Sequence, residues 1–224
     1  MLPGDRFRSV RALVVMLCCL LAAAGDALAQ DAPGLPVELL LAAALQESAR
    51  APQPFNATLH LARDGVVRTM ALHVDGPKVR VQHGATAQVE RQDLGRLWLF
   101  DVKKQTFLDL PLSRDTLASP ALLRQECTIT PQGEEMVDGR RSLKYHVRMP
   151  NRFYEPELLR PADEARQVEM TVWHSPELGV LLRREGPGNA TMTLADIIPG
   201  PQSMELFQVP EGYRRASLPA NFAK

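Results

Sequence analysis

The side chains best able to bind a metal or act as a nucleophile are five histidines and one cysteine: His60, His73, His83, His146, His174 and Cys127. In the strands predicted below, His60 and His73 lie four residues apart along one hairpin, which separates them by roughly 13 Å at about 3.4 Å per residue. This distance is too long for one shared zinc ion, whose bonds are about 2 Å. We therefore predict surface or rim histidines and no bound metal.

Other catalytic patterns are missing from the sequence. It has no G-x-S-x-G elbow, and Cys127 has no histidine close to it in the chain. A single cysteine of this kind is more often a small buried apolar residue than a nucleophile. Glu134 and Glu135 look like paired carboxylates, but adjacent residues of a strand point to opposite faces. The sequence therefore predicts no enzyme activity and no cofactor.

The first 29 residues have the pattern of an export signal. Arginines precede an apolar run over 12–24, and Ala-Leu-Ala at 27–29 suits a signal peptidase. A membrane anchor is the alternative, but the run is shorter than the roughly 20 residues of a spanning helix. We predict a cleaved signal peptide over 1–29 and a periplasmic location.

The remaining chain is suited to one domain. We assign residues 30–216 to it and 217–224 to a frayed tail. Lysines plus arginines equal aspartates plus glutamates, at 26 each. This balance does not indicate a nucleic-acid partner.

Apolar spacing predicts a helix over 35–50, and alternation then predicts a three-strand meander over 55–83. Its two expected turns, Asp64-Gly65 and Asp75-Gly76, are typical of tight hairpins. With two residues in each turn, Leu59 faces Met70 and Met70 faces Val81. The apolar residues of the meander then share one face.

The stretch LWLFDVKKQTFLDLPL, residues 97–112, predicts a hairpin that is apolar on both sides. One side carries four leucines: Leu97, Leu99, Leu108 and Leu110. The other side carries three aromatic residues: Trp98, Phe100 and Phe107. Each side must be covered, either by this chain or by another molecule.

The rest of the chain continues mainly as strands. A loop and short helix are expected over 111–126, then a hairpin with Asp138-Gly139 at its turn and a bulge near Gly133. Residues 150–165 interrupt the strands with three prolines, and three more strands follow. The expected fold class is α+β, an antiparallel sheet of about 9–11 strands with helices on one face.

Three C-terminal stretches, GEEMVDGRRSLKYHV, VWHSPELGVLLRRE and LFQVPEGY, resemble in order and spacing the signatures of periplasmic lipoprotein-carrier-like domains, the LolA/LolB/RseB-like fold. The likeness covers most of residues 36–215 and is closest to the outer-membrane lipoprotein-sorting-like members. It implies a strongly curved, incomplete β-barrel with helices over its concave, apolar face. It also implies binding rather than catalysis.

An oily concave face could hold a lipid or lipoprotein acyl chain, since each buried methylene contributes about 0.8 kcal/mol. The predicted lining residues are Leu59, Met70, Leu72, Val81, Leu97, Leu99, Leu108, Leu110, Met170, Val172 and Met192. The alternative is that the helix over 37–48 fills the hollow and makes an ordinary core. A second functional hypothesis is a protein-binding module of envelope stress or assembly, which would use Trp98, Phe100 and Phe107 or the 150–165 segment.

Overall fold

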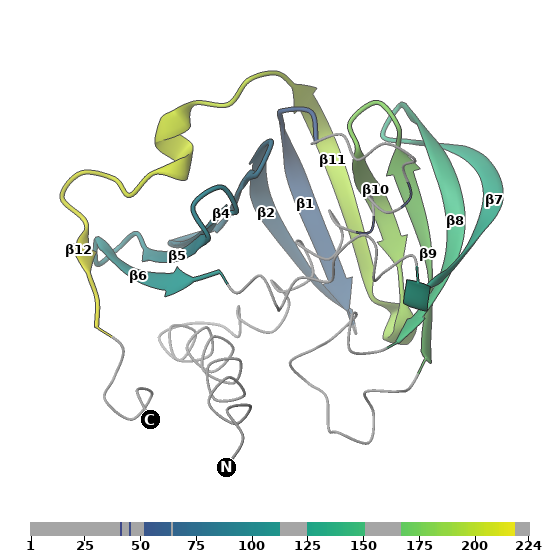
Figure 1. The fold of residues 1–224 in the computed structure, drawn as a ribbon, viewed down its shortest axis with the longest axis horizontal. Helices are drawn as coiled ribbons and strands as arrows, with labels where there is room; N and C mark the ends of the chain where they lie inside the picture. Colours follow the sequence, from purple (N-terminus) through teal and green to yellow (C-terminus); the bar gives the residue numbers. More distant parts are fainter. Residues whose placement is uncertain are drawn as a thin grey trace, which may run out of the picture.

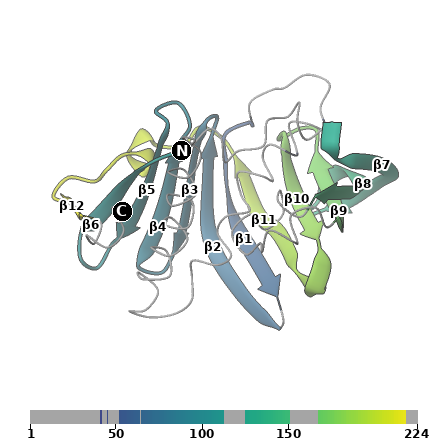
Figure 2. The same ribbon diagram turned by 60° about the horizontal axis from the view of Figure 1, so that its bottom comes forward.

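The computed structural model describes residues 41, 45, 52–63, 65–112, 125–150 and 167–217. They form one sheet of twelve strands in the order β12-β6-β5-β4-β3-β2-β1-β11-β10-β9-β8-β7. Neighbouring strands are antiparallel except β12 and β6, which are parallel, so the sheet is mixed. Figures 1 and 2 show the strands side by side, with β6 and β12 at one end and β7 at the other.

The strands are β1 (Phe55–Arg63), β2 (Val66–Asp75), β3 (Lys78–His83), β4 (Thr86–Arg91), β5 (Arg96–Asp101), β6 (Thr106–Pro111), β7 (Thr128–Val137), β8 (Arg140–Pro150), β9 (Gln167–Ser175), β10 (Val180–Glu185), β11 (Thr191–Pro199) and β12 (Arg214–Arg215). Two short 3₁₀ helices accompany them, η3 (Pro187–Asn189) and η4 (Met204–Phe207). The chain runs from β11 through η4 to β12, across the full width of strands β1 to β6 (Figure 1).

The first and third Asp-Gly turns form as predicted. Leu59 pairs with Met70, and Val137 pairs with Arg140 across a two-residue turn. Asp138 and Gly139 both have positive φ, at 49° and 69°, which is the requirement of a type I′ turn. The bulge expected near Gly133 is also present, between β7 and β8.

The predicted register of the second turn is wrong by two residues. Asp75 pairs with Lys78, so Gly76 and Pro77 make the turn, and Val81 faces Leu72 instead of Met70. An ion pair of 2.8 Å between Lys78 and Asp75 closes the hairpin. Because side chains alternate with a period of two, a shift of two residues keeps every side chain on its predicted face.

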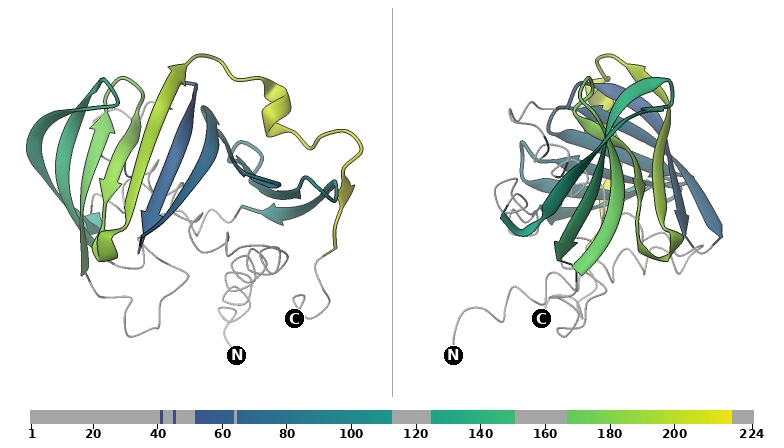
Figure 3. Two further views of the ribbon diagram at one scale, coloured as in Figure 1. Left: turned by 180° about the vertical axis from the view of Figure 1, so that it is seen from behind. Right: turned by 90° about the vertical axis from the view of Figure 1, so that its right-hand side faces the viewer.

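The predicted fold class is wrong. The described residues form a nearly all-β structure whose sheet is open and not strongly curled, and the elements described over their full length include no α-helix. Figure 3 shows the same sheet from behind and from its β7 side. Closure would need the edges to pair, but β12 has only two residues, and the other edge strand, β7, is bulged and mostly exposed. Alternation in the sequence predicts pairing, and it carries no information on curvature.

Several predicted segments lie outside the described residues. These are the signal peptide over 1–29, most of the helix over 35–50, residues 113–124 of the loop and short helix expected over 111–126, residues 151–165 of the segment 150–165, and residues 218–224 of the tail. Leu41 and Leu45 are described, and both are helical. Leu41 is buried within the largest apolar cluster, and Leu45 packs against it.

Candidate functional site

All the residues predicted to line a lipid site lie on one face of the sheet, which we call the apolar face. Paired residues of adjacent strands share a face, and the pairings connect Leu59 to Met70, Leu72 to Val81, Leu99 to Leu108 and Leu97 to Leu110. The same face continues to Met192 through Leu61, and from there to Val172 and Met170. Apart from Val81, which is half-buried, these predicted residues are buried.

The apolar face is divided into two clusters. The larger cluster includes Leu59, Met70, Leu72 and Met170, together with Leu41. The smaller consists of the four leucines of β5 and β6, Leu97, Leu99, Leu108 and Leu110, with Leu112 and Ala216 beside them. A leucine or valine on β4 would join the two clusters, but β4 has polar residues there.

Gln88 and Glu90 are the side chains of β4 on the apolar face. Glu90 pairs with Val79 on one side and Leu97 on the other, and Gln88 pairs with Val81 and Leu99. Glu90 is only 3% exposed. Its Oε1 accepts a hydrogen bond of 2.8 Å from Gln88 Nε2, whereas its Oε2 is buried with no hydrogen-bond partner.

Burial raises the pKa of the Glu90 carboxyl to about 7, and the hydrogen bond from Gln88 partly opposes this rise. A buried carboxylate is expensive because the protein solvates charge less well than water does. Sequence reasoning missed this residue. In TAQVER, Ala87 and Val89 are the apolar residues, so alternation alone assigns Gln88 and Glu90 to a polar side.

The opposite face of β4 to β6 carries an aromatic cluster. Ala87, Val89, Phe100 and Phe207 are its buried members, and Trp98, Phe107, Leu206, Val209 and Tyr213 pack around them. The Phe100 ring stacks on Phe107 at 6.0 Å and meets Tyr213 edge-on at 5.7 Å. The segment 200–216, which we call the C-terminal cover, therefore encloses this face.

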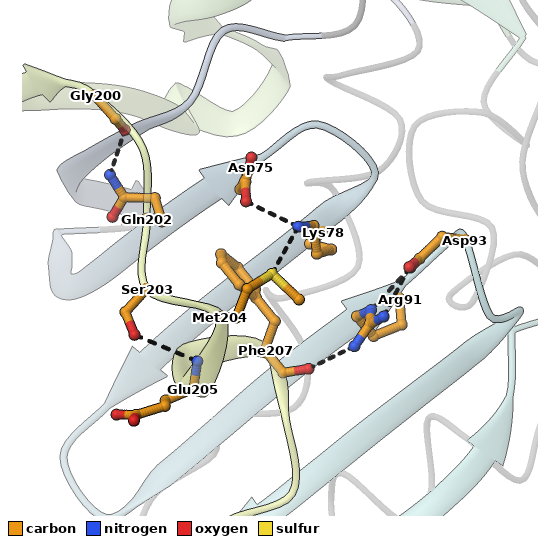
Figure 4. Close-up of polar contacts among 10 residues, drawn as sticks. All are labelled: Asp75, Lys78, Arg91, Asp93, Gly200, Gln202, Ser203, Met204, Glu205 and Phe207. Carbon is orange, nitrogen blue, oxygen red and sulfur yellow. Dashed lines mark hydrogen bonds and ion pairs between the residues drawn. The ribbon is translucent and has the colours of Figure 1, made fainter.

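Polar contacts attach the C-terminal cover to the sheet (Figure 4). Arg91 Nη1 donates to the backbone oxygen of Phe207 at 2.9 Å, and its other nitrogens donate to both carboxylate oxygens of Asp93 at 2.8 and 2.7 Å. The Arg91 guanidinium lowers the pKa of the Asp93 carboxyl. Lys78 Nζ reaches Met204 Sδ at 3.0 Å.

The three predicted partner-binding residues lie together in this cluster. Phe100 is 2% exposed, and Trp98 and Phe107 are half-buried. Trp98 Nε1 donates to Asp109 Oδ1 at 3.2 Å. The sequence left open whether this chain or another molecule covers this side of the hairpin. In the structure the same chain covers it.

The histidines are dispersed, and within the described residues no group of three potential ligands could hold a metal ion. His60 is hydrogen-bonded to Thr69, and His73 to Gln202. For His174 the predicted surface or rim position is wrong, because its side chain is buried. Burial lowers the pKa of His174 to about 4, so the ring is neutral at pH 7.

The other residues considered for catalysis make contacts that are typical of structural residues. Cys127 is half-buried against the larger apolar cluster, and burial raises the pKa of its thiol to about 11. A thiol with so high a pKa is a poor nucleophile. Glu134 pairs with Arg141, whereas Glu135 accepts hydrogen bonds from Lys144 and Trp173. The two carboxylates therefore do not act as a pair.

None of the helices in the described part of the chain combines the length and the apolar character that a bilayer crossing requires.

No family model matches the chain, and no curated protein matches it. Among solved structures, the chain is similar to the Pseudomonas aeruginosa MucA/MucB complex, with a TM-score of 0.49, 17% identity and coverage of 76% of this chain and 59% of that chain. It is also similar to the Mycobacterium tuberculosis lipoprotein LppX, with a TM-score of 0.37, 13% identity and coverage of 86% and 97%. For a LolA superfamily protein from Nitrosomonas europaea, the TM-score is 0.31 and the identity is 11%, and the match covers 76% of this chain and 96% of that chain.

The chain spans about three fifths of the MucB chains that it matches. The Nitrosomonas europaea protein belongs to the superfamily that the three C-terminal stretches resemble. With TM-scores below 0.5, membership of this chain in that superfamily stays a prediction.

Proposed function

We propose that this protein binds a lipid or the acyl chain of a lipoprotein on its apolar face, without catalysing a reaction. The observation that carries the proposal is the single face shared by all the predicted lining residues, from Met170 on β9 to Leu110 on β6. Such a face offers long apolar contact, and each methylene that it buries contributes about 0.8 kcal/mol. The export pattern over 1–29 supports a periplasmic location for this binding.

The smaller leucine cluster is the part of the face best suited to an acyl chain. In the larger cluster Leu41 already packs among the sheet residues, which favours an ordinary core there. The leucines of β5 and β6 form a separate buried cluster beyond the polar pair of β4. We therefore place the acyl chain against Leu97, Leu99, Leu108 and Leu110.

The second hypothesis, a protein-binding module, has no comparable support. Its aromatic candidates are enclosed by the C-terminal cover, and its other candidate, the 150–165 segment, lies outside the described residues apart from Pro150.

The test is native mass spectrometry of the protein after gentle extraction from its own membranes, together with titration of a fluorescent acyl probe that has an uncharged head. We expect co-purified lipid and saturable probe binding. Leu99→Glu should abolish both, because it introduces a charge into the leucine cluster. Leu94→Glu is the matched control, since Leu94 is 54% exposed in the β4–β5 turn.

The proposal fails if the wild-type protein carries no lipid and does not bind the probe. It also fails if Leu99→Glu, with an intact circular dichroism spectrum, binds as well as Leu94→Glu.

A further inference from the structure

One carboxylate oxygen of Glu90, Oε2, makes no hydrogen bond within the described residues, and apolar residues flank the side chain. The Glu90 residue is 3% exposed, and its Oε2 is buried with no hydrogen-bond partner among the described residues. A buried polar atom without a partner loses its hydrogen bonds to water and gains nothing in return. An apolar side chain at this position would also unite the two apolar clusters. The unpaired oxygen therefore indicates a polar group that is supplied from outside the described protein.

The surroundings of Glu90 restrict what that group can be. Val79 and Leu97 flank the carboxyl across the two neighbouring strands, and Gln88 is hydrogen-bonded to its other oxygen. A ligand group that reaches Oε2 must therefore be small and must be attached to apolar atoms. This is the arrangement of a small polar group on a long apolar molecule.

The charge of the carboxyl further restricts the chemistry. When Glu90 is ionised, Oε2 needs a donor, and when it is protonated the hydroxyl needs an acceptor. Because its pKa is raised to about 7, both forms are populated near neutral pH. A hydroxyl or an amide can donate and accept, so it satisfies both forms. A phosphate or carboxylate would be repelled by the ionised form.

We propose that Gln88 and Glu90 form a polar subsite for the hydroxyl or amide group of an amphiphile, whose apolar chain lies against Leu97 and Leu99. This inference rests on the proposed lipid binding and specifies its ligand class. Glu90 is then a specificity-determining residue, because its ionised form selects ligands that carry a hydrogen-bond donor.

The experiment is competition against the fluorescent acyl probe by three compounds of equal chain length: 1-dodecanol, dodecanamide and methyl dodecanoate. The ester accepts hydrogen bonds but cannot donate them. At pH 8, where most Glu90 carboxyls are ionised and can only accept, we expect the alcohol and the amide to compete roughly tenfold more strongly than the ester in the wild-type protein, as one buried hydrogen bond predicts. Glu90→Leu should remove this difference without weakening the ester, and Glu90→Gln, whose amide can donate to the ester carbonyl, should reduce the difference by strengthening the ester.

The outcomes distinguish failure of the polar subsite from failure of lipid binding. If the probe binds and the preference for alcohol and amide is the same in the wild type and Glu90→Leu, the polar subsite is wrong and lipid binding stands. If the probe binds but the ester competes as well as the alcohol, the subsite is also wrong. If the probe does not bind the wild type, the proposed function and the subsite fail together.

Discussion

The two faces of β4 to β6 differ in how their apolar side chains are covered. On the aromatic side, the C-terminal cover places Phe207 and Tyr213 against Phe100, and Arg91 anchors the cover through a backbone carbonyl. On the apolar side, four leucines are separated from the main cluster by a buried carboxyl with one unpaired oxygen. The first arrangement is typical of a folding core, whereas the second includes a polar atom that folding alone does not require. Two similarly apolar faces of one hairpin can therefore have different roles.

The largest expected effect comes from truncating the centre of the aromatic side. Phe207 is fully buried, so Phe207→Ala should lower the free energy of unfolding by about 3–5 kcal/mol through lost contacts and a cavity. Urea denaturation measures this change, and Glu205→Ala, at an exposed position of the same 3₁₀ helix, is the control. A loss below about 1 kcal/mol for Phe207→Ala would mean that the cover is not part of the core.

A second prediction concerns Glu90 on the apolar face, whose substitution should raise the stability of the protein instead of lowering it. The pKa of Glu90 is raised from 4.5 in its ordinary state to about 7 in the fold, so the folded protein holds the proton more tightly. Its contribution to stability is therefore full below pH 4.5 and is lost as pH rises through 7. Glu90→Gln cannot ionise, so at pH 8 it should be more stable than the wild type by about 2–3 kcal/mol.

Thermal denaturation from pH 4 to pH 8 tests this sign. The two proteins should differ little at pH 4, which serves as the internal control. A wild type that gains stability relative to Glu90→Gln as pH rises would contradict the unpaired, buried state of the carboxyl.

A smaller effect is expected at the anchor of the cover. Arg91→Lys keeps the charge but loses the two-pronged contact with Asp93, and it cannot keep the Phe207 carbonyl bond at the same time. We expect a loss of about 1–2 kcal/mol in the free energy of unfolding. Because the Asp93 carboxyl would lose its main stabilising hydrogen bonds, its pKa should rise in an NMR titration. An unchanged Asp93 titration would show that this contact does not persist in solution.

The smallest predicted effect is at the rim of the aromatic cluster. Trp98→Phe keeps an aromatic ring but removes the hydrogen bond from Nε1 to Asp109. A single partly exposed hydrogen bond of this kind is worth about 0.5–1 kcal/mol, which urea denaturation can resolve. If Trp98→Phe instead abolishes capture of an envelope protein and leaves stability unchanged, the protein-binding hypothesis gains its first support.

The sequence predicted local pairing better than it predicted shape. Asp64-Gly65 and Asp138-Gly139 were sufficient to predict the pairing of their flanking strands, because a tight turn determines the register of its own hairpin. The second turn shifted by two residues, because Asp75 became the partner of Lys78 rather than a turn residue. Curvature and closure depend on how distant edges meet, so the open sheet could not be predicted from alternation.

Likewise, the sequence predicted only the part of the candidate site that a single hairpin brings together. The leucines of 97–110 were found because the hairpin pattern places them together. Glu90 was missed because its apolar neighbours, Val79 and Leu97, lie on two other strands. The role of the segment 200–216 was also missed, since Phe207 meets β4 over a separation of 116 residues in the chain.

That separation has a consequence for biosynthesis. Translation at about 5–20 residues per second leaves an interval on the order of 10 s between the emergence of Arg91 from the ribosome and that of Phe207. Throughout this interval the rings of Trp98, Phe100 and Phe107 have no intramolecular lid and can adhere to other nascent chains. We therefore expect the newly made polypeptide to depend on a holding chaperone until residues 200–216 are synthesised.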